Sequence, residues 1–123
     1  MKNVVILISG TGSNMAALLR AAQQQHWGTR LGARVAAVIS NRADAKGLQT
    51  AQAAGVATAV VDHQAFAGRE AFDAALMQAI DAHQPTLVVL AAFMRILTPG
   101  FVSHSAGRLL NIPPSLLPAF PGL

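Results

Sequence analysis

The stretch ILISGTGSNMAALL, from Ile6 to Leu19, combines an apolar run, a glycine-rich turn and a second apolar run. The first run shows no polar alternation, which is typical of a strand covered on both faces in a parallel sheet. Gly10 and Gly12 tolerate positive φ angles and allow a close approach to the backbone. The stretch therefore predicts a strand, a tight turn and a helix, which form the opening unit of an α/β fold.

The remainder of the chain repeats this alternation. Apolar runs predict five strands, at Asn3–Ser9, Arg34–Ser40, Ala57–Val61, Thr86–Ala92 and Arg108–Ile112. Between them the sequence favours helices at Asn14–Gln25, Ala45–Ala54 and Arg69–His83, with a short turn near Pro99–His104. Asp44 is a candidate N-cap for the second helix, and Gly55 is its candidate stop. The predicted fold is α/β: one Rossmann-like domain over residues 1–123, with an open, mostly parallel sheet and flanking helices.

The composition fits one small globular domain and excludes several classes of protein. Of the 123 residues, 53% are hydrophobic and 11% are charged, so a core can form and disorder is not expected. There is no cysteine, which excludes disulfides and thiolate metal sites. No apolar run approaches the ~18 residues that span a bilayer, and no secretory signal is apparent. We expect a cytoplasmic protein without a membrane partner.

The formal net charge of +4 comes from nine Lys and Arg residues that are scattered along the chain. Nucleic-acid binding usually needs such residues clustered on one face, so no nucleic-acid partner is expected. Scattered arginines with few acids suit a small anionic ligand better. No pair of histidines has metal-ligand spacing beside acidic residues, so no metal site is predicted.

In an open α/β sheet, ligands bind beyond the carboxyl ends of the strands. The predicted ends are Ser9–Asn14, Ser40–Arg42, Asp62–Arg69, Phe93–Leu97 and Asn111–Pro118. At the first of these, the amides of Gly12, Ser13 and Asn14 would point out from a helix start, where the helix dipole favours an anion. A phosphate cradle is one interpretation of this turn. The other is a tight turn capped by Ser or Asn.

The glycine spacing departs from two well-known nucleotide loops. In a dinucleotide fingerprint a third glycine would stand at Met15, and the second strand would end in an acid rather than in Ser40-Asn41-Arg42. Arg42 suits a 2′-phosphate, however, so an NADP-binding half-domain stays open. No Gly-Lys-Ser/Thr follows the turn, which excludes a Walker loop.

Five segments, in this order, resemble the phosphoribosylglycinamide formyltransferase (glycinamide ribonucleotide transformylase) family. They are SGTGSNMAALL, VISNRADAKGLQTAQAAGV, FAGREAFD, PTLVVLAAFMRILTPGFV and GRLLNIPPSLLPAFPGL, and together they extend over essentially the whole chain. The resemblance implies a Rossmann-like fold and a folate-dependent step of purine synthesis. In that step a formyl group passes from the co-substrate, 10-formyltetrahydrofolate, to the amine of glycinamide ribonucleotide, without a metal.

The resemblance also implies roles for individual residues. Gly12, Ser13 and Asn14 would hold the phosphate of the substrate, and Asn111 would be the catalytic amide. The folate would lie against Arg69, Met94, Arg95, Ile96 and Leu97.

Pattern alone leaves other interpretations of these residues open. Arg69 would readily form a surface ion pair with Asp73, one helical turn along. Asn111 would serve equally well to fix a turn before the prolines. Met94, Ile96 and Leu97 also suit a hydrophobic core. His63 and His104 are candidate catalytic histidines, although such positions are more often on the surface or at a helix cap.

The chain departs from the family pattern where the chemistry is expected. That pattern is Asn-Ile-His-Pro-Ser-Leu-Leu-Pro, but Pro113 occupies the histidine position. The family also uses an Asp further downstream, which these 123 residues do not include. We therefore expect a domain that is incomplete at its C-terminus and impaired in turnover, with an exposed last strand that favours self-association. A formyltetrahydrofolate deformylase-like hydrolase and a non-catalytic remnant that binds a phosphorylated ligand stay open as alternatives.

Overall fold

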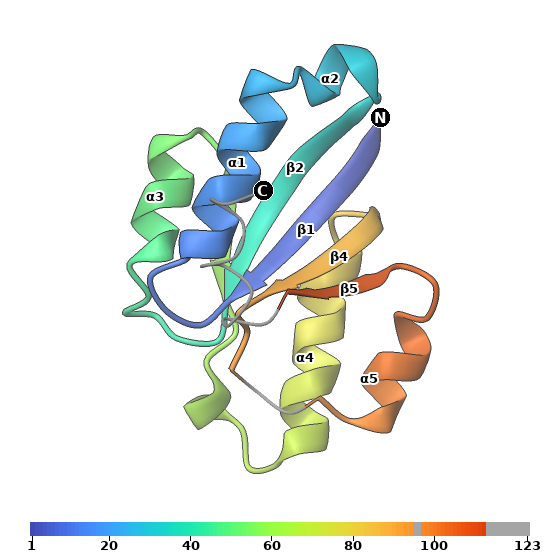
Figure 1. Cartoon of the computed structure of the whole chain (residues 1–123). Helices are drawn as coiled ribbons and strands as arrows, with labels where there is room; N and C mark the ends of the chain where they lie inside the picture. Colours follow the sequence, from blue (N-terminus) through green and yellow to red (C-terminus); the bar gives the residue numbers. More distant parts are fainter. Residues whose placement is uncertain (95–96, 113–123) are drawn as a thin grey trace.

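The computed structural model describes residues 1–94 and 97–112, which form a parallel sheet with helices on both faces (Figure 1). The strand order is β3-β2-β1-β4-β5. The elements are β1 (Lys2–Ile8), α1 (Ser13–Gln24), α2 (Trp27–Arg30), β2 (Ala33–Ser40), α3 (Gly47–Ala53), β3 (Ala57–Val60), a 3-10 turn (His63–Ala65), α4 (Arg69–Asp81), β4 (Pro85–Ala91), α5 (Pro99–His104) and β5 (Leu109–Ile112). The predicted α/β fold and its five strands are confirmed, and each strand end lies within about one residue of its expected place.

The central strand β1 divides its side chains between two hydrophobic cores. Val4, Ile6 and Ile8 belong to the core that α1 and α3 cover. Val5 and Leu7 belong to the core that α4 and α5 cover. All five side chains are at most 7% exposed, because both faces of the strand are covered. Double coverage explains why this strand is an unbroken apolar run in the sequence.

The chain changes direction across the sheet at β1. It first runs outward through β2 and β3, and then returns to the other side of β1 with β4 and β5. The loop after β1 leads to α1 on one face, while the loop after β4 leads to α5 on the opposite face. Loops that diverge in this way leave a crevice between the two carboxyl ends, which is the usual ligand site of such sheets.

The helix after β2 begins later than the sequence predicts. Lys46 is the N-cap of α3, and no side chain caps this helix. The prediction that Asp44 is the N-cap is wrong, because its carboxylate pairs with Arg42 instead. The predicted stop is confirmed: Gly55 follows the C-cap Ala54 and has a φ of 78°. This left-handed conformation at the C′ position favours glycine.

The interpretation that Asp73 forms a surface ion pair with Arg69, which was based on helical spacing, is also wrong. Asp73 is 1% exposed, and its Oδ2 accepts a hydrogen bond from Thr98 N at 2.6 Å. It therefore ties α4 to the start of α5 rather than forming a surface ion pair. Within residues 1–94 and 97–112, no ion pair joins Asp73 to Arg69, which is exposed at the first position of α4.

The last described strand, β5, pairs with β4 alone among the described strands. Its Leu110 side chain is 47% exposed. Self-association through this edge stays a prediction. In the described part of the chain, no helix has the length and apolar character needed to cross a bilayer.

A cluster of ion pairs joins the ends of α4 and α5 to Arg108, the residue before β5, near the start of β4. Asp81 accepts hydrogen bonds from His104 Nε2 at 2.7 Å and from Arg108 Nη2 at 3.1 Å. Arg108 also donates to Pro85 O at 3.3 Å. Partial burial raises the pKa of the Asp81 carboxyl, but the hydrogen bonds and charges of His104 and Arg108 outweigh it, so this pKa lies below the ordinary 3.8. His104 is thus engaged far from the carboxyl ends, which argues against a catalytic role for it.

Asp81→Asn is expected to lower the free energy of unfolding by about 0.5 kcal/mol near neutral pH, a small effect because the carboxylate is 42% exposed and screened by water. Folding lowers the pKa of this group. Its contribution is therefore complete above the unfolded value of 3.8 and disappears as the pH falls through the lower folded value. Urea unfolding of both proteins at several pH values measures the difference. A difference that grew toward acid pH would contradict this role.

Candidate functional site

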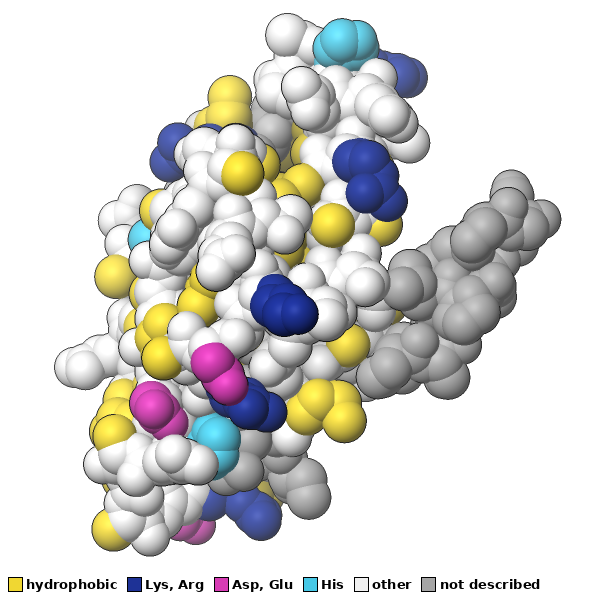
Figure 2. All heavy atoms as spheres, turned by 90° about the vertical axis from the view of Figure 1, so that its left-hand side faces the viewer, with side chains coloured by type: hydrophobic (Ala, Val, Ile, Leu, Met, Phe, Trp, Pro, Cys, Tyr) yellow, Lys and Arg dark blue, Asp and Glu magenta, His cyan; other side chains and the backbone are white. Residues whose placement is uncertain are grey.

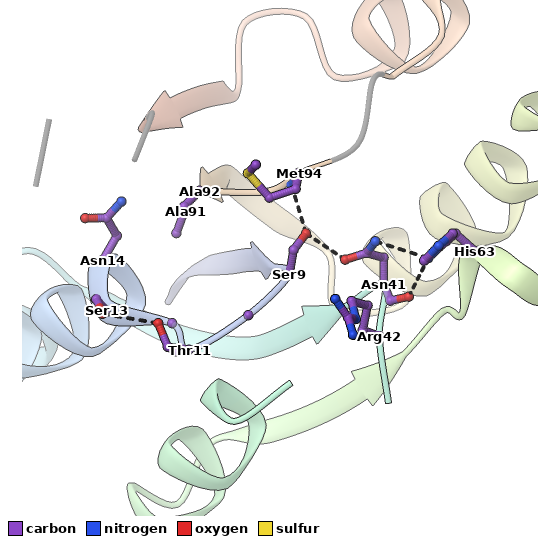
Figure 3. Close-up of a pocket in the computed structure, with 12 residues that line it drawn as sticks. Ser9, Thr11, Ser13, Asn14, Asn41, Arg42, His63, Ala91, Ala92 and Met94 are labelled. Atoms are coloured by element: carbon purple, nitrogen blue, oxygen red, sulfur yellow. Dashed lines mark hydrogen bonds between the residues drawn. The ribbon is translucent and has the colours of Figure 1, made fainter. Parts of the chain in front are cut away.

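A cavity of about 590 Å³ opens beyond the carboxyl ends of the strands (Figure 3). Its volume falls within the range of small-molecule sites. The lining comes from the loops after β1, β2 and β4 and from the 3-10 turn: residues 9–14, Asn41, Arg42, His63, Ala91, Ala92 and Met94. The cavity therefore lies where strand-end reasoning places the ligand.

Two loops of the cavity touch backbone to backbone. Gly12 precedes α1 in a left-handed conformation, with a φ of 73° and a ψ of 33°. A Cβ on Gly12 would stand 3.1 Å from Gly47 Cα, and a Cβ on Gly47 would stand 3.2 Å from Thr11 O. Gly47 N also donates to Gly10 O at 3.1 Å. The start of α3 thus supports the β1–α1 turn, at a separation that a side chain at either glycine would prevent.

The start of α1 presents hydrogen-bonding groups to the cavity, and we call residues 10–14 the cradle. The first amides of a helix have no partner within it, and a bond from Ala16 N to Gly12 O at 2.8 Å opens the helical pattern here. Ser13 is exposed, with its Oγ 3.3 Å from Thr11 Oγ1. Asn14 is 5% exposed, and its Oδ1 has no hydrogen-bond partner among the described residues. Amide donors and the helix dipole suit an anion, while the Asn14 oxygen requires a donor.

A line of hydrogen bonds runs along one side of the cavity (Figure 3). Met94 N donates to Ser9 Oγ at 2.8 Å, and Ser9 Oγ donates to Asn41 Oδ1 at 2.7 Å. Asn41 Nδ2 lies 3.3 Å from His63 Nδ1. Ser9 and Asn41 are 7% and 2% exposed. We call Met94, Ser9, Asn41 and His63 the cross-tie, because it joins four separate segments of the chain.

Arg42 lines the cavity but is engaged by a neighbour. Its Nε and Nη2 donate to the two carboxylate oxygens of Asp44, at 3.1 and 3.0 Å. The hydrogen bonds and the charge of Arg42 hold the pKa of the Asp44 carboxyl below 3.8. Figure 2 shows acidic, basic and histidine side chains together in the lower part of the face it presents, whereas the other Lys and Arg side chains visible on this face are dispersed. Pairing with Asp44 makes Arg42 less suited to the 2′-phosphate of NADP.

The structure brings together part of the predicted site. Gly12, Ser13, Asn14 and Met94 all line the cavity. The other predicted positions lie elsewhere in the fold or outside the described residues.

Leu97 packs against the core beneath α4 and α5, and Arg69 is exposed at the start of α4. Asn111 lies on β5 opposite Leu90, where it is exposed, and it is not among the described residues that line the cavity. Arg95, Ile96 and Pro113 lie outside the described residues. The roles of all these residues stay predictions.

Sequence reasoning missed several residues that build the cavity. Ser9 and Asn41 stand at strand ends that the sequence marks as ligand-facing, but their bonds to each other and to His63, itself a candidate from the sequence, span long separations along the chain. Sequence reasoning also missed Gly47. A glycine at the start of a predicted helix, in a chain that has another glycine turn, is a signal that could have indicated it. In residues 1–94 and 97–112, no group of three or more His, Asp or Glu residues is placed to hold a metal ion.

Comparisons with known proteins agree with this geometry. Residues 2–123 match a family model described as formyl transferase. Phosphoribosylglycinamide formyltransferase of Escherichia coli (strain K12) is 54% identical over 121 residues, which are 98% of this chain and 55% of that protein. The trifunctional purine biosynthetic protein adenosine-3 of Drosophila melanogaster is 48% identical over 122 residues, which are 99% of this chain and 9% of that protein.

Solved structures give the same result. Phosphoribosylglycinamide formyltransferase from Coxiella burnetii, in complex with CHES, superposes with a TM-score of 0.84 at 47% identity, covering 95% of this chain and 53% of that one. The enzyme of the same name from Brucella melitensis gives a TM-score of 0.84 at 48% identity, covering 99% and 62%. The chain thus spans about half the length of these single-function relatives. Because the family model matches nearly the whole sequence and the fold agrees, the chain belongs to the formyl transferase family.

Proposed function

We propose that this chain takes part in formyl transfer from 10-formyltetrahydrofolate to glycinamide ribonucleotide, with the phosphate of the ribonucleotide held in the cradle. Family membership and the names of its relatives support the proposal. The main observation behind the proposal is the set of hydrogen-bonding groups in the cradle. The amides at the start of α1 need an acceptor, and the buried Asn14 Oδ1 needs a donor. A sugar phosphate offers both, through its phosphate oxygens and its hydroxyl groups.

The cradle also favours this activity over the alternatives. A formyltetrahydrofolate deformylase uses water as the acceptor, so it has no phosphorylated substrate for such a cradle to hold. A dinucleotide would need an acid or a free cation after β2, whereas Arg42 there is paired with Asp44.

The folate would lie beside the cradle, against Arg69 and the segment formed by Met94, Arg95, Ile96 and Leu97. The Met94 side chain lines the cavity and is 69% exposed, which suits contact with a flat apolar ring. Arg69 is exposed, and no ion pair in the described part of the chain engages it. Its guanidinium is therefore available to a carboxylate of the folate.

Formyl transfer is an acyl transfer, and its demands define a role for Asn111. The amine attacks the formyl carbon, a C–N bond forms, and the carbonyl electron pair moves onto oxygen. Collapse of this oxyanion breaks the bond to the folate nitrogen, and the proton that the attacking amine loses is taken up by that leaving nitrogen. Asn111 Nδ2 would donate to the oxyanion, an effect worth roughly 10²–10³ in rate. Its exposure on β5 leaves the amide accessible to a ligand.

Titration calorimetry with glycinamide ribonucleotide tests the cradle directly. Ser13→Ala is expected to weaken binding about tenfold, because one hydrogen bond to a charged phosphate is lost. Ser103→Ala, at an exposed position on α5, removes the same hydroxyl away from the cavity and should leave the affinity unchanged. Equal affinities of the wild type and Ser13→Ala, or no binding by the wild type, would argue against the cradle.

A further inference from the structure

Ser9 connects two segments that are distant in the sequence but adjacent at the cavity. Its hydroxyl accepts from Met94 N, 85 residues away, and donates to Asn41 Oδ1, 32 residues away. The directions of both bonds are fixed. A backbone N–H can only donate and the Asn41 oxygen can only accept, so the single hydroxyl proton must point to Asn41.

The cross-tie follows the order of the sheet. Met94 comes after β4, Ser9 after β1, Asn41 after β2 and His63 after β3, and these strands are consecutive neighbours in the order β3-β2-β1-β4. Figure 3 shows the four residues in a line beside the cavity. These hydrogen bonds therefore connect the loops that carry the ligand-facing residues to one another. They do so beyond the last backbone hydrogen bonds between the strands.

The backbone on the N-terminal side of Met94 is restrained by Phe93, which packs against the core that α4 and α5 cover. Ala92 N still pairs with Ile112 O at 2.9 Å, and Ala92 then adopts a left-handed conformation with a φ of 59°, which is unfavourable for a residue other than glycine. The Met94 side chain is 69% exposed, so core packing does not hold it. The bond to Ser9 thus adds a direct polar anchor for the main chain of Met94, next to the packed Phe93.

We propose that Ser9 is a positioning residue: oriented by Asn41, it fixes the main chain of Met94 so that Met94, which lines the cavity, can contact the folate co-substrate. This inference rests on the proposed function. Removal of the hydroxyl leaves the part-buried Met94 N and the buried Asn41 Oδ1 without this partner, which favours movement of Met94. The cradle has its own support from Gly47, so its affinity for phosphate should not depend on Ser9.

The test compares the wild type with Ser9→Ala, Ser9→Thr and Ser103→Ala. Calorimetry uses two probes, 5-formyltetrahydrofolate for the folate segment and ribose 5-phosphate for the cradle. We expect Ser9→Ala to weaken the folate probe about tenfold and to change ribose 5-phosphate by less than about twofold. Ser9→Thr keeps the hydroxyl and should restore most of the folate affinity. In the ligand-free protein, amide exchange of Met94 followed by NMR should be accelerated in Ser9→Ala alone.

The outcomes separate the inference from the proposed function. If the wild type binds the folate probe and Ser9→Ala binds it equally well, or if both probes weaken together, the positioning role is overturned. A Met94 amide that exchanges as fast in the wild type as in Ser9→Ala also overturns it. If the wild type binds neither probe, the proposed function is overturned. This result is obtained before any variant is compared.

Discussion

Gly47→Val is expected to lower the free energy of unfolding by about 3 kcal/mol and to weaken ribonucleotide binding by about tenfold or more. A Cβ at this position would stand 2.6 Å from Ile8 Cδ1 and 3.2 Å from both Gly12 Cα and Thr11 O. Ile8 is fully buried, so its side chain has little room to turn away. The backbone of the cradle must then move, which displaces the amides that face the phosphate. Urea unfolding and calorimetry measure the two effects.

The matched control is Gly28→Ala on α2. A Cβ there meets nothing within 4 Å, so neither stability nor ribonucleotide binding should fall. Gly47→Ala, which adds only the Cβ, should lie between the control and Gly47→Val in both measurements. If Gly47→Val kept the stability and the affinity of the control, the contact between the two loops would not support the cradle.

The sheet could be predicted because a strand that is buried on both faces has an apolar sequence throughout. Val4 to Ile8 is apolar throughout since alternate side chains enter different cores, each covered by its own helices. Helix ends were less predictable, because several side chains could cap them. Asp44 has the chemistry of an N-cap, yet its bond to Arg42 takes that carboxylate away from α3. The four-residue helix α2 follows His26 in a left-handed conformation, which no pattern in the sequence indicates.

The part of the site that could be predicted from the sequence lies within one short stretch of the chain. Gly12, Ser13 and Asn14 lie within one helix start, so the spacing of neighbours along the chain is enough to predict that they line the cavity together. The bond from Met94 to Ser9 instead depends on β4 lying beside β1, and sequence spacing carries no such information. Asp73 shows the same limit: a salt bridge with Arg69 satisfied the helical spacing, but the packing of α5 gave the carboxylate another partner.

Pro113→His is expected to raise the rate of formyl transfer by roughly 10²–10⁴. The attacking amine must lose a proton, and proline has neither an ionisable group nor a backbone N–H. His63 lines the cavity, and its Nδ1 lies 3.1 Å from Asn41 O and 3.3 Å from Asn41 Nδ2 within the cross-tie, so its catalytic role stays a prediction. A histidine two residues after Asn111 would place a base beside the amide that stabilises the oxyanion. The absorbance of the released folate measures the rate in both proteins.

Pro113→Gln is the control for this prediction, because glutamine removes the proline ring and adds polarity without adding a base. A rate that rises only with histidine, and rises with pH as an imidazole of pKa about 6.5 loses its proton, would identify general base catalysis as the missing element. Ribonucleotide affinity should stay about the same in all three proteins, because the substitutions leave the hydrogen-bonding groups of the cradle unchanged. Equal rates for Pro113→His and Pro113→Gln would show instead that the proline does not limit the rate of formyl transfer. A factor common to ribonucleotide binding at the first βα turn and to reaction at Asn111 would then limit that rate.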